Sequence, residues 1–209
     1  MLLRENDHIL FLGDSITDCG RLQDRLYNNY GLGRGYVSLI ASLLGARLPD
    51  WRLTFTNRGI SGNRVYDLEA RLGPDAIDLK PTLVSVFVGV NDTNARYKHN
   101  RPSPLDDYVA SYRRMLEQLR KLTDRIVVIE PFLMDFDDRC RMMREDLNPR
   151  IDATRQLARE FGTLYIPLDG LFAAACCRRE VSFWTDDGIH PLPPGHGLIA
   201  DAWIQSVTG

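Results

Sequence analysis

Short apolar runs alternate with longer stretches of helical periodicity along this chain, and that alternation limits the folds open to it. Runs of this length that stop at turn residues are typical of buried strands. The runs that we interpret as strands cover residues 8–12, 53–57, 83–88, 125–129 and 164–168. The third run is apolar on both faces, which a central parallel strand requires, and Pro167 suits the last run to a sheet edge.

Helical spacing of apolar residues fills the intervals between these runs. The stretches that predict helices cover residues 36–44, 65–72, 105–119 and 145–161, followed by a closing helix around 198–203. We interpret residues 28–35 as a flexible loop and residues 134–144 as a solvated loop that borders the functional site. Strands that alternate with helices predict a parallel sheet with helices on both faces. The 44% hydrophobic composition is ample for a single domain, residues 1–209.

The charge balance narrows the class of partner. The chain has 26 Lys and Arg against 28 Asp and Glu, scattered along its length, so no electrostatic case exists for nucleic acid or a membrane surface. Its N-terminus is charged within a few residues and carries no apolar run long enough for a signal peptide or a membrane span. The four cysteines show no C-x-x-C pairing, which favours reduced thiols. We therefore expect a soluble cytoplasmic protein with a small-molecule partner, no metal and no cofactor.

The stretch Gly13-Asp14-Ser15 directly follows the first apolar run, so Ser15 sits where a strand ends and solvent begins. In open parallel α/β sheets, ligands bind outside the carboxyl ends of the strands, which makes this a place for chemistry. Taken alone, the stretch also fits a simpler interpretation in which Asp14, Ser15 and Thr17 only cap the next helix.

Polar residues also follow the other predicted strands. Gly62 comes after the second, Asn91 after the third, and Asp187 and His190 after the fifth. In a parallel sheet all of these positions share one rim. A nucleophilic serine needs a base, the base needs an orienting carboxylate, and the oxyanion needs preorganised donors. This rim supplies each part.

One of the four histidines fits the role of base. Of the other three, His8 precedes a strand, His99 lies in a basic stretch, and His196 stands between two glycines at the start of the last helix. His190 has Asp187 three residues before it, so a single turn lets Asp187 reach Nδ1 and leaves Nε2 free to accept the Ser15 proton. Asp186 is the alternative on proximity grounds, but we expect its side chain to point elsewhere.

The ordered set resembles the SGNH hydrolases, also called the GDSL esterase family. The blocks that carry the resemblance are Gly13-Asp14-Ser15, Gly59-Ile60-Ser61-Gly62-Asn63, Gly89-Val90-Asn91-Asp92 and Asp187-Gly188-Ile189-His190-Pro191. The resemblance implies an α/β fold, a three-layer α/β/α sandwich with a five-stranded parallel sheet of flavodoxin-like type. It also implies Ser15 as nucleophile, His190 as base and Asp187 as its partner, with an oxyanion hole from the Ser15 and Gly62 backbone N–H groups and the Asn91 amide.

Within this family, residues 11–21, 35–37 and 57–63 are similar to the acetylxylan esterase branch, whose members remove acetyl groups from xylo-oligosaccharides, often as oligomers. This implies a serine esterase for short-chain acetyl esters of carbohydrates, working through an acyl-enzyme, with a homo-oligomer as one option. That branch can place Trp immediately before the triad carboxylate, whereas here Asp186 stands there and the nearest Trp is Trp184. The residues that we expect to contact substrate are Asp14, Trp184 and Ile189.

Other interpretations stay open. Residues 186–191 are also similar to the thioesterase and lysophospholipase branch, and an aryl-ester hydrolase of the same family fits the same blocks. A non-catalytic carbohydrate-binding module that retains the fold is an alternative from another class. A carboxylate-dependent phosphatase acting through Asp14 would need Mg²⁺ and a second carboxylate, but Ile16 stands two residues after Asp14. The ordered serine set explains more residues.

Overall fold

Five strands form one fully parallel sheet in the computed structural model, which describes residues 1–22, 31–101 and 103–209. The order across the sheet is β2-β1-β3-β4-β5. The strands are β1 (His8–Gly13), β2 (Thr54–Gly59), β3 (Leu83–Phe87), β4 (Ile126–Ile129) and β5 (Leu164–Ile166). The predicted five-stranded parallel sheet is therefore confirmed, with β3 in the centre and β5 at an edge. The loop predicted at residues 28–35 lies partly outside the described residues.

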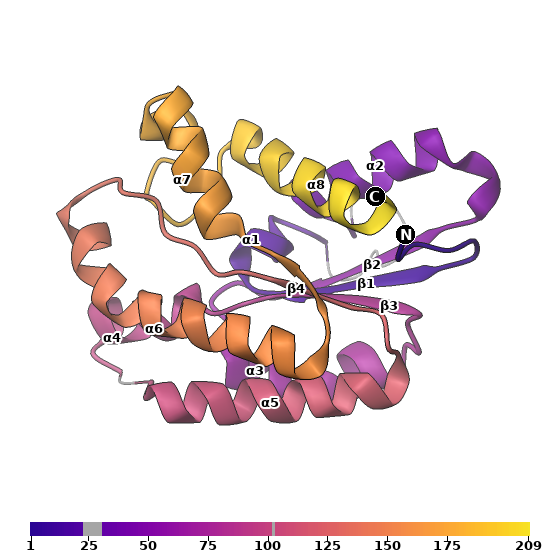
Figure 1. The fold of residues 1–209 in the computed structure, drawn as a ribbon, viewed down its shortest axis with the longest axis horizontal. Coiled ribbons are helices and arrows are strands. Elements are labelled where there is room, and N and C mark those ends of the chain that lie inside the picture. The colour runs from indigo at the N-terminus through magenta and orange to yellow at the C-terminus, as the bar shows by residue number, and fades with distance from the viewer. Residues whose placement is uncertain (23–30, 102) are drawn as a thin grey trace.

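Helices cover both faces of this sheet, as Figure 1 shows, with α2, α7 and α8 on one side and α3, α5 and α6 on the other. Their bounds are α1 (Ser15–Asp18), α2 (Tyr36–Arg47), α3 (Val65–Ala70), α4 (Val90–His99), α5 (Leu105–Leu122), α6 (Asp138–Phe161), α7 (Leu168–Arg178) and α8 (Pro193–Thr208). This is the three-layer α/β/α arrangement expected from the sequence. Every residue of β3 is buried, because helices pack on both of its faces. Its one polar side chain, Ser85, accepts a hydrogen bond from the Trp203 indole at 3.1 Å.

The strand register lines up the ends from which the site is built. Gly13 at the end of β1 pairs with Gly59 at the end of β2 and with Phe87 at the end of β3. The chain also reverses its direction of progress across the sheet between β1 and β3, and open α/β sheets place ligands at such a switch point. The residues that follow these strands, Ser15 and Asn91 among them, therefore emerge side by side.

The helix α6 corrects one prediction. It begins at Asp138, seven residues before the predicted start, because the Asp137 carboxylate accepts a hydrogen bond from the Cys140 N–H and caps the first turn. The segment 134–144, interpreted as a solvated loop, is thus helical from Asp138 onward, and Cys140 and Met143 are buried in the core. The interpretation of this segment as a loop was wrong for residues 138–144 and correct for residues 134–137.

Two further helices were not predicted, and one predicted helix is shorter. Within the described residues, α4 follows β3 and α7 follows β5, whereas α3 ends at Ala70, two residues before its predicted end, and a π-helical turn, Gly73–Ile77, comes soon after it. Since α7 and a 3₁₀ turn at Val181–Phe183 follow β5, the segment that holds Asp187 and His190 does not leave the fifth strand directly. In the described ranges no helix is both long and apolar enough to cross a membrane.

Candidate active site

The serine at the end of β1 is held by its neighbours. Asp14 caps α1, because its carboxylate accepts a hydrogen bond from the Ile16 N–H at 3.0 Å. The capping interpretation is therefore correct for Asp14, yet Ser15 is partly exposed and its hydroxyl is free for other partners. A Cβ on Gly13 would lie 2.1 Å from Thr17 Oγ1 and 2.6 Å from the Phe87 carbonyl oxygen, so the chain packs here only with glycine.

Ser15 meets the predicted base across 175 residues of sequence. Its Oγ lies 2.9 Å from His190 Nε2, and His190 Nδ1 lies 2.6 Å from Asp187 Oδ2. The other carboxylate oxygen, Oδ1, accepts the His190 backbone N–H at 2.7 Å. The structure thus brings the three residues together in one hydrogen-bonded chain, with Asp187 rather than Asp186 as the partner of the imidazole.

A threonine that the sequence analysis missed holds the turn between Asp187 and His190. Thr185 is fully buried, and its hydroxyl donates to the His190 carbonyl at 2.8 Å. The same oxygen accepts the backbone N–H groups of Gly188 at 2.9 Å and of Asp187 at 3.2 Å. Hydroxyl side chains commonly bond nearby backbone groups in this way. The sequence signal that could have identified Thr185 is its position two residues before Asp187, at the start of the turn that contains Asp187 and Gly188.

The first turn of α6 supports this turn from behind. Arg139 Nη2 donates to the Asp187 carbonyl at 2.9 Å, and the Gly188 carbonyl accepts the Met134 N–H at 2.9 Å. Gly188 has a φ of +84°, and a Cβ there would lie 2.5 Å from Cys140 Sγ. Only glycine satisfies both the backbone conformation and the contact. The position of Asp187 therefore depends on α6 as well as on its own turn.

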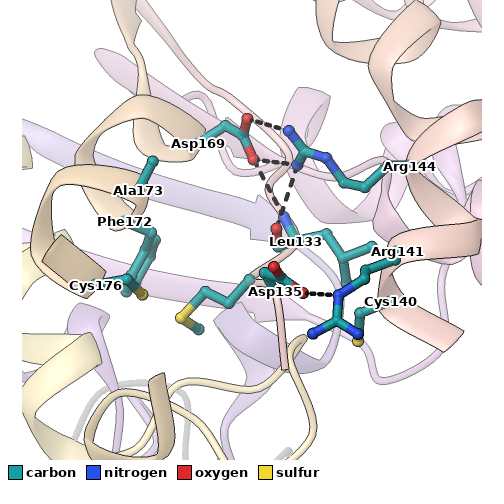
Figure 2. A pocket seen from close by; sticks show the side chains of 10 residues that line it. Leu133, Asp135, Cys140, Arg141, Arg144, Asp169, Phe172, Ala173 and Cys176 are labelled. Atoms are coloured by element: carbon teal, nitrogen blue, oxygen red, sulfur yellow. Dashed lines mark hydrogen bonds and ion pairs between the residues drawn. The ribbon is translucent and has the colours of Figure 1, made fainter. Parts of the chain in front are cut away.

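A hollow of about 430 Å³, here called the rear hollow, opens between α6 and α7 behind this support (Figure 2). Its charged side chains pair with one another. Arg144 makes two hydrogen bonds to Asp169, at 2.6 and 2.8 Å, and Arg141 Nε lies 2.7 Å from Asp135 Oδ1. The rear hollow contains neither Ser15 nor His190 in its lining, so it is separate from the serine.

The hollow that contains the serine, here called the Ser15 hollow, has a volume of about 640 Å³. Its lining consists of Ser15, Ser61, Gly62, Arg64, Tyr66, Asp67, Asn91, Asn94, Ala95, Lys98, Arg101 and His190. Gly62 has a φ of +82°, a conformation that favours glycine. Asn91 Nδ2 donates to the Asn63 carbonyl at 3.1 Å, which fixes the amide beside Gly62 and leaves its second proton free. All three predicted oxyanion donors thus line one hollow with the base.

The electrostatics of the acid and the base follow from their mutual contact. Burial by itself raises the pKa of Asp187, but hydrogen bonds from His190 and from the Ile189 N–H outweigh it and hold the pKa below its usual range. The hydrogen bond that His190 donates to the Asp187 carboxylate raises the pKa of His190 above its ordinary value of 6.5, against the effect of burial. Asp187 therefore stays ionised at neutral pH and fixes the proton on His190 Nδ1.

The residues expected to contact the substrate do not line the Ser15 hollow in the described part of the chain. Asp14 and Ile189 are only 1% and 3% exposed, and burial raises the pKa of Asp14 to about 7. Trp184 donates through Nε1 to the Arg179 carbonyl and packs edge-on against Phe183. Direct substrate contact at these three positions stays a prediction.

The other described histidine rings fit the elimination made from the sequence. His8 opens β1, at the opposite rim, and its Nε2 lies 2.8 Å from Thr56 Oγ1. His196 Nδ1 accepts the Tyr36 N–H at 3.2 Å, and burial lowers the pKa of His196 to about 4, so it packs as a neutral ring. Within the described residues, no group of three or more His, Cys, Asp and Glu side chains is placed to hold a metal ion.

Comparisons with known proteins agree with this geometry. Residues 11–198 match the GDSL-like Lipase/Acylhydrolase family. The chain is 31% identical to an acetylxylan esterase of Geobacillus stearothermophilus over 99% of its own length and 96% of that protein, and 26% identical to the isoamyl acetate-hydrolyzing esterase 1 homolog of Mus musculus over 91% and 77%.

A solved structure shares the whole fold. The crystal structure of a catalytic mutant of Axe2, an acetylxylan esterase from Geobacillus stearothermophilus, superposes with a TM-score of 0.93 at 30% identity and covers 100% of this chain and 97% of that one. Sequence blocks, sheet topology and the match over most of the chain thus agree, and we conclude that the chain belongs to the GDSL-like lipase/acylhydrolase family and is a carboxylic ester hydrolase.

Proposed function

We propose that the chain removes acetyl groups from carbohydrate esters, with acetylated xylo-oligosaccharides as the substrate class, through a Ser-His-Asp acyl-enzyme mechanism. The observation that carries the mechanism is the hydrogen-bonded chain from Ser15 Oγ through His190 to Asp187. The substrate class is supported by the likeness to an acetylxylan esterase over nearly the whole chain. The cytoplasmic location predicted from the sequence is part of the same proposal.

In the first step His190 Nε2 accepts the Ser15 proton while Oγ attacks the ester carbonyl carbon. The carbonyl oxygen becomes an oxyanion, which the Ser15 and Gly62 N–H groups and the Asn91 amide stabilise. Asp187 keeps the other imidazole proton on Nδ1, which orients the ring and stabilises the imidazolium that forms. Donors fixed before the reaction cost no reorganisation as the charge develops.

In the second step His190 gives the proton from Nε2 to the leaving alcohol oxygen, and the bond between that oxygen and the acyl carbon breaks. Ser15 then carries the acetyl group. A water molecule repeats the sequence: His190 takes its proton, the hydroxyl oxygen attacks the acyl carbon, and Ser15 Oγ leaves with the proton returned to it. Acetate and the free enzyme result.

The matched test compares Ser15→Ala with Ser42→Ala, an exposed serine on α2. We expect Ser15→Ala to lose hydrolysis of both p-nitrophenyl acetate and acetylated xylo-oligosaccharides, and Ser42→Ala to keep both. A fluorophosphonate probe is expected to label Ser15 in the parent chain, which a non-catalytic binding module would not allow. Equal hydrolysis by the two variants contradicts the mechanism. Preference for long-chain or thioester substrates contradicts the substrate class alone.

A further inference from the structure

The Ser15 hollow carries an excess of positive charge. Its lining includes three cationic side chains, Arg64, Lys98 and Arg101, against one carboxylate, Asp67. The chain as a whole has a formal net charge of −2, so the hollow has the opposite sign to the molecule. A concave site lined by one sign of charge concentrates ligands of the other sign.

The helix α4 directs one of these cations toward the hollow. Asn91, Ala95 and Lys98 recur at helical spacing and all line it, so one face of α4 forms its wall. At 1.5 Å per residue, Lys98 lies about 10 Å along the helix axis from Asn91. Its long side chain leans back toward the helix N-terminus, which shortens this distance.

Arg101 reaches the same wall because the chain folds back at the end of α4. The C-cap residue Asn100 has a φ of +48°, and the Arg101 N–H donates to the Ala95 carbonyl at 2.9 Å. Such a left-handed cap turns the following residue over the last helical turn. Lys98 and Arg101 thus lie at the end of the Ser15 hollow that is distant from the oxyanion donors.

The pairing of these cations differs. Arg64 lies 3.7 Å from Asp67 and 4.1 Å from the centre of the Tyr66 ring, so these contacts partly neutralise its charge. Arg96, also on α4 but outside the hollow, pairs with Asp146 at 3.3 Å. Within the described residues, neither Lys98 nor Arg101 has a carboxylate within ion-pair distance. Lys98 and Arg101, which line the hollow, are thus the cations at the end of α4 that have no carboxylate partner among the described residues.

The neutral lining suits a sugar. The Asn94 amide adds a polar group between Asn91 and Lys98, and Tyr66, which is 41% exposed, adds an aromatic ring that Arg64 covers on one face. Apart from that ring and Ala95, the lining is polar, so it offers little to a long acyl chain.

We infer that the preferred substrate is an acetylated oligosaccharide that carries a uronic acid carboxylate, and that Lys98 and Arg101 bind this carboxylate while the acetyl carbonyl lies at Ser15. The inference rests on the proposed function and specifies its substrate. The anion is placed on the alcohol part, up to about 10 Å from the oxyanion donors. Both cations are exposed, so the effect on specificity is moderate and sensitive to salt.

The test compares two substrates that differ only at one carboxyl group. One is a xylo-oligosaccharide with a glucuronic acid branch, acetylated chemically; the other is the same acetylated molecule with the carboxyl then reduced to an alcohol by borane, which leaves the acetyl esters intact. We expect kcat/KM to be about threefold to tenfold higher for the acidic substrate at low salt. The ratio is expected to approach one in about 0.5 M salt, because screening shortens the Debye length.

Variants of Lys98 and Arg101 test whether these two residues cause the preference for the acidic substrate. In Lys98→Gln combined with Arg101→Gln, the ratio of the two kcat/KM values is expected to fall to about one, with each single variant between. Lys121→Gln, an exposed lysine at the end of α5, is the matched control and is expected to keep the full ratio. A ratio that survives in the double variant overturns the inference.

Two further substrates separate the inference from the function on which it rests. Equal rates on the acidic and reduced oligosaccharides overturn the inference and leave the esterase proposal standing. No hydrolysis of either one or of p-nitrophenyl acetate overturns the proposed function itself. If acetyl-CoA is preferred and the double variant abolishes that preference, the bound anion is a phosphate, and the uronic acid assignment is wrong.

Discussion

The nucleophile and the base are held in place by different means. Ser15 follows β1 directly, between Asp14 and Ile16, which are 1% and 2% exposed, so the core fixes its backbone. The His190 and Asp187 side chains are 49% and 37% exposed, and a local turn and the start of α6 hold them. The comparison teaches that changes on the serine side disturb folding and chemistry together, whereas changes on the histidine side can alter chemistry alone.

The largest expected effect comes from removing the base. We expect His190→Ala to lower kcat on p-nitrophenyl acetate by roughly 10⁴- to 10⁶-fold, as loss of a triad member does. Because the side chain is exposed, the free energy of unfolding is expected to change by less than about 1 kcal/mol. Denaturant titration alongside kinetics checks both. A large loss of stability breaks the proposed difference between the two sides.

Removal of the side-chain oxyanion donor comes next. We expect Asn91→Ala to lower kcat by about 10²- to 10³-fold, with a smaller change in KM, because the amide acts on the charge of the transition state. The control is Asn94→Ala, which lies one helical turn away on α4 and outside the predicted oxyanion donors. Equal losses of kcat in the two variants contradict the role assigned to Asn91.

Thr185 sharpens the comparison, because it acts only through the turn. Thr185→Val removes the hydroxyl that bonds the Asp187 and Gly188 N–H groups and the His190 carbonyl. We expect a loss of about tenfold or more in kcat, since displaced catalytic geometry is costly. The pKa of His190 read from the pH profile of kcat/KM is expected to fall toward 6.5, because its contact with Asp187 loosens. Thr185→Ser keeps the hydroxyl and is expected to restore both.

The smallest expected effect concerns Asp14 and stability. Its pKa of about 7 in the folded state lies above the ordinary 3.8, so the folded state holds the proton more tightly than the unfolded state. Stability from this group is therefore fully present below about pH 4 and is lost as pH rises through about 7. Asn in its place keeps an oxygen for the Ile16 N–H and does not ionise.

The parent chain is therefore expected to lose free energy of unfolding from pH 5 to pH 8, whereas Asp14→Asn does not lose this contribution. Denaturant titration of both proteins at the two pH values measures the difference. Asp50→Asn, at an exposed position, is the matched control and is expected to show no such difference from the parent chain. If the free energy of unfolding depends on pH in the same way in the parent chain and in Asp14→Asn, the raised pKa assigned to the buried Asp14 carboxyl is contradicted.

The strands and the blocks that follow them were predictable from the sequence because each is a local pattern. A buried parallel strand must be apolar on both faces, and residues 83–88 show this directly. The three motif blocks that follow β1, β2 and β3 lie close together in space because these strands end level with one another, at Gly13, Gly59 and Phe87. Convergence of Ser15, Gly62 and Asn91 then follows from the parallel order alone.

What sequence reasoning missed lacks such a pattern. The helix α4 reads VNDTNARYKH and has no apolar stripe, because its buried positions include Asp92 and Thr93, which bond to the Val65 N–H and to the Arg150 side chain, while another face lines a polar hollow. The start of α6 depends on a single cap at Asp137. Thr185 acts through bonds to backbone groups, which no spacing rule reports. In each case polar contacts with distant or local backbone, rather than periodicity, decide the structure.

The separation of Ser15 and His190 by 175 residues has a consequence for how the enzyme gains activity. Contacts between distant parts of a chain form late, since the entropy of closing the loop must be overcome before they stabilise anything. Ester hydrolysis therefore reports completion of the whole molecule, and its recovery after dilution from denaturant should lag behind the return of helical circular dichroism.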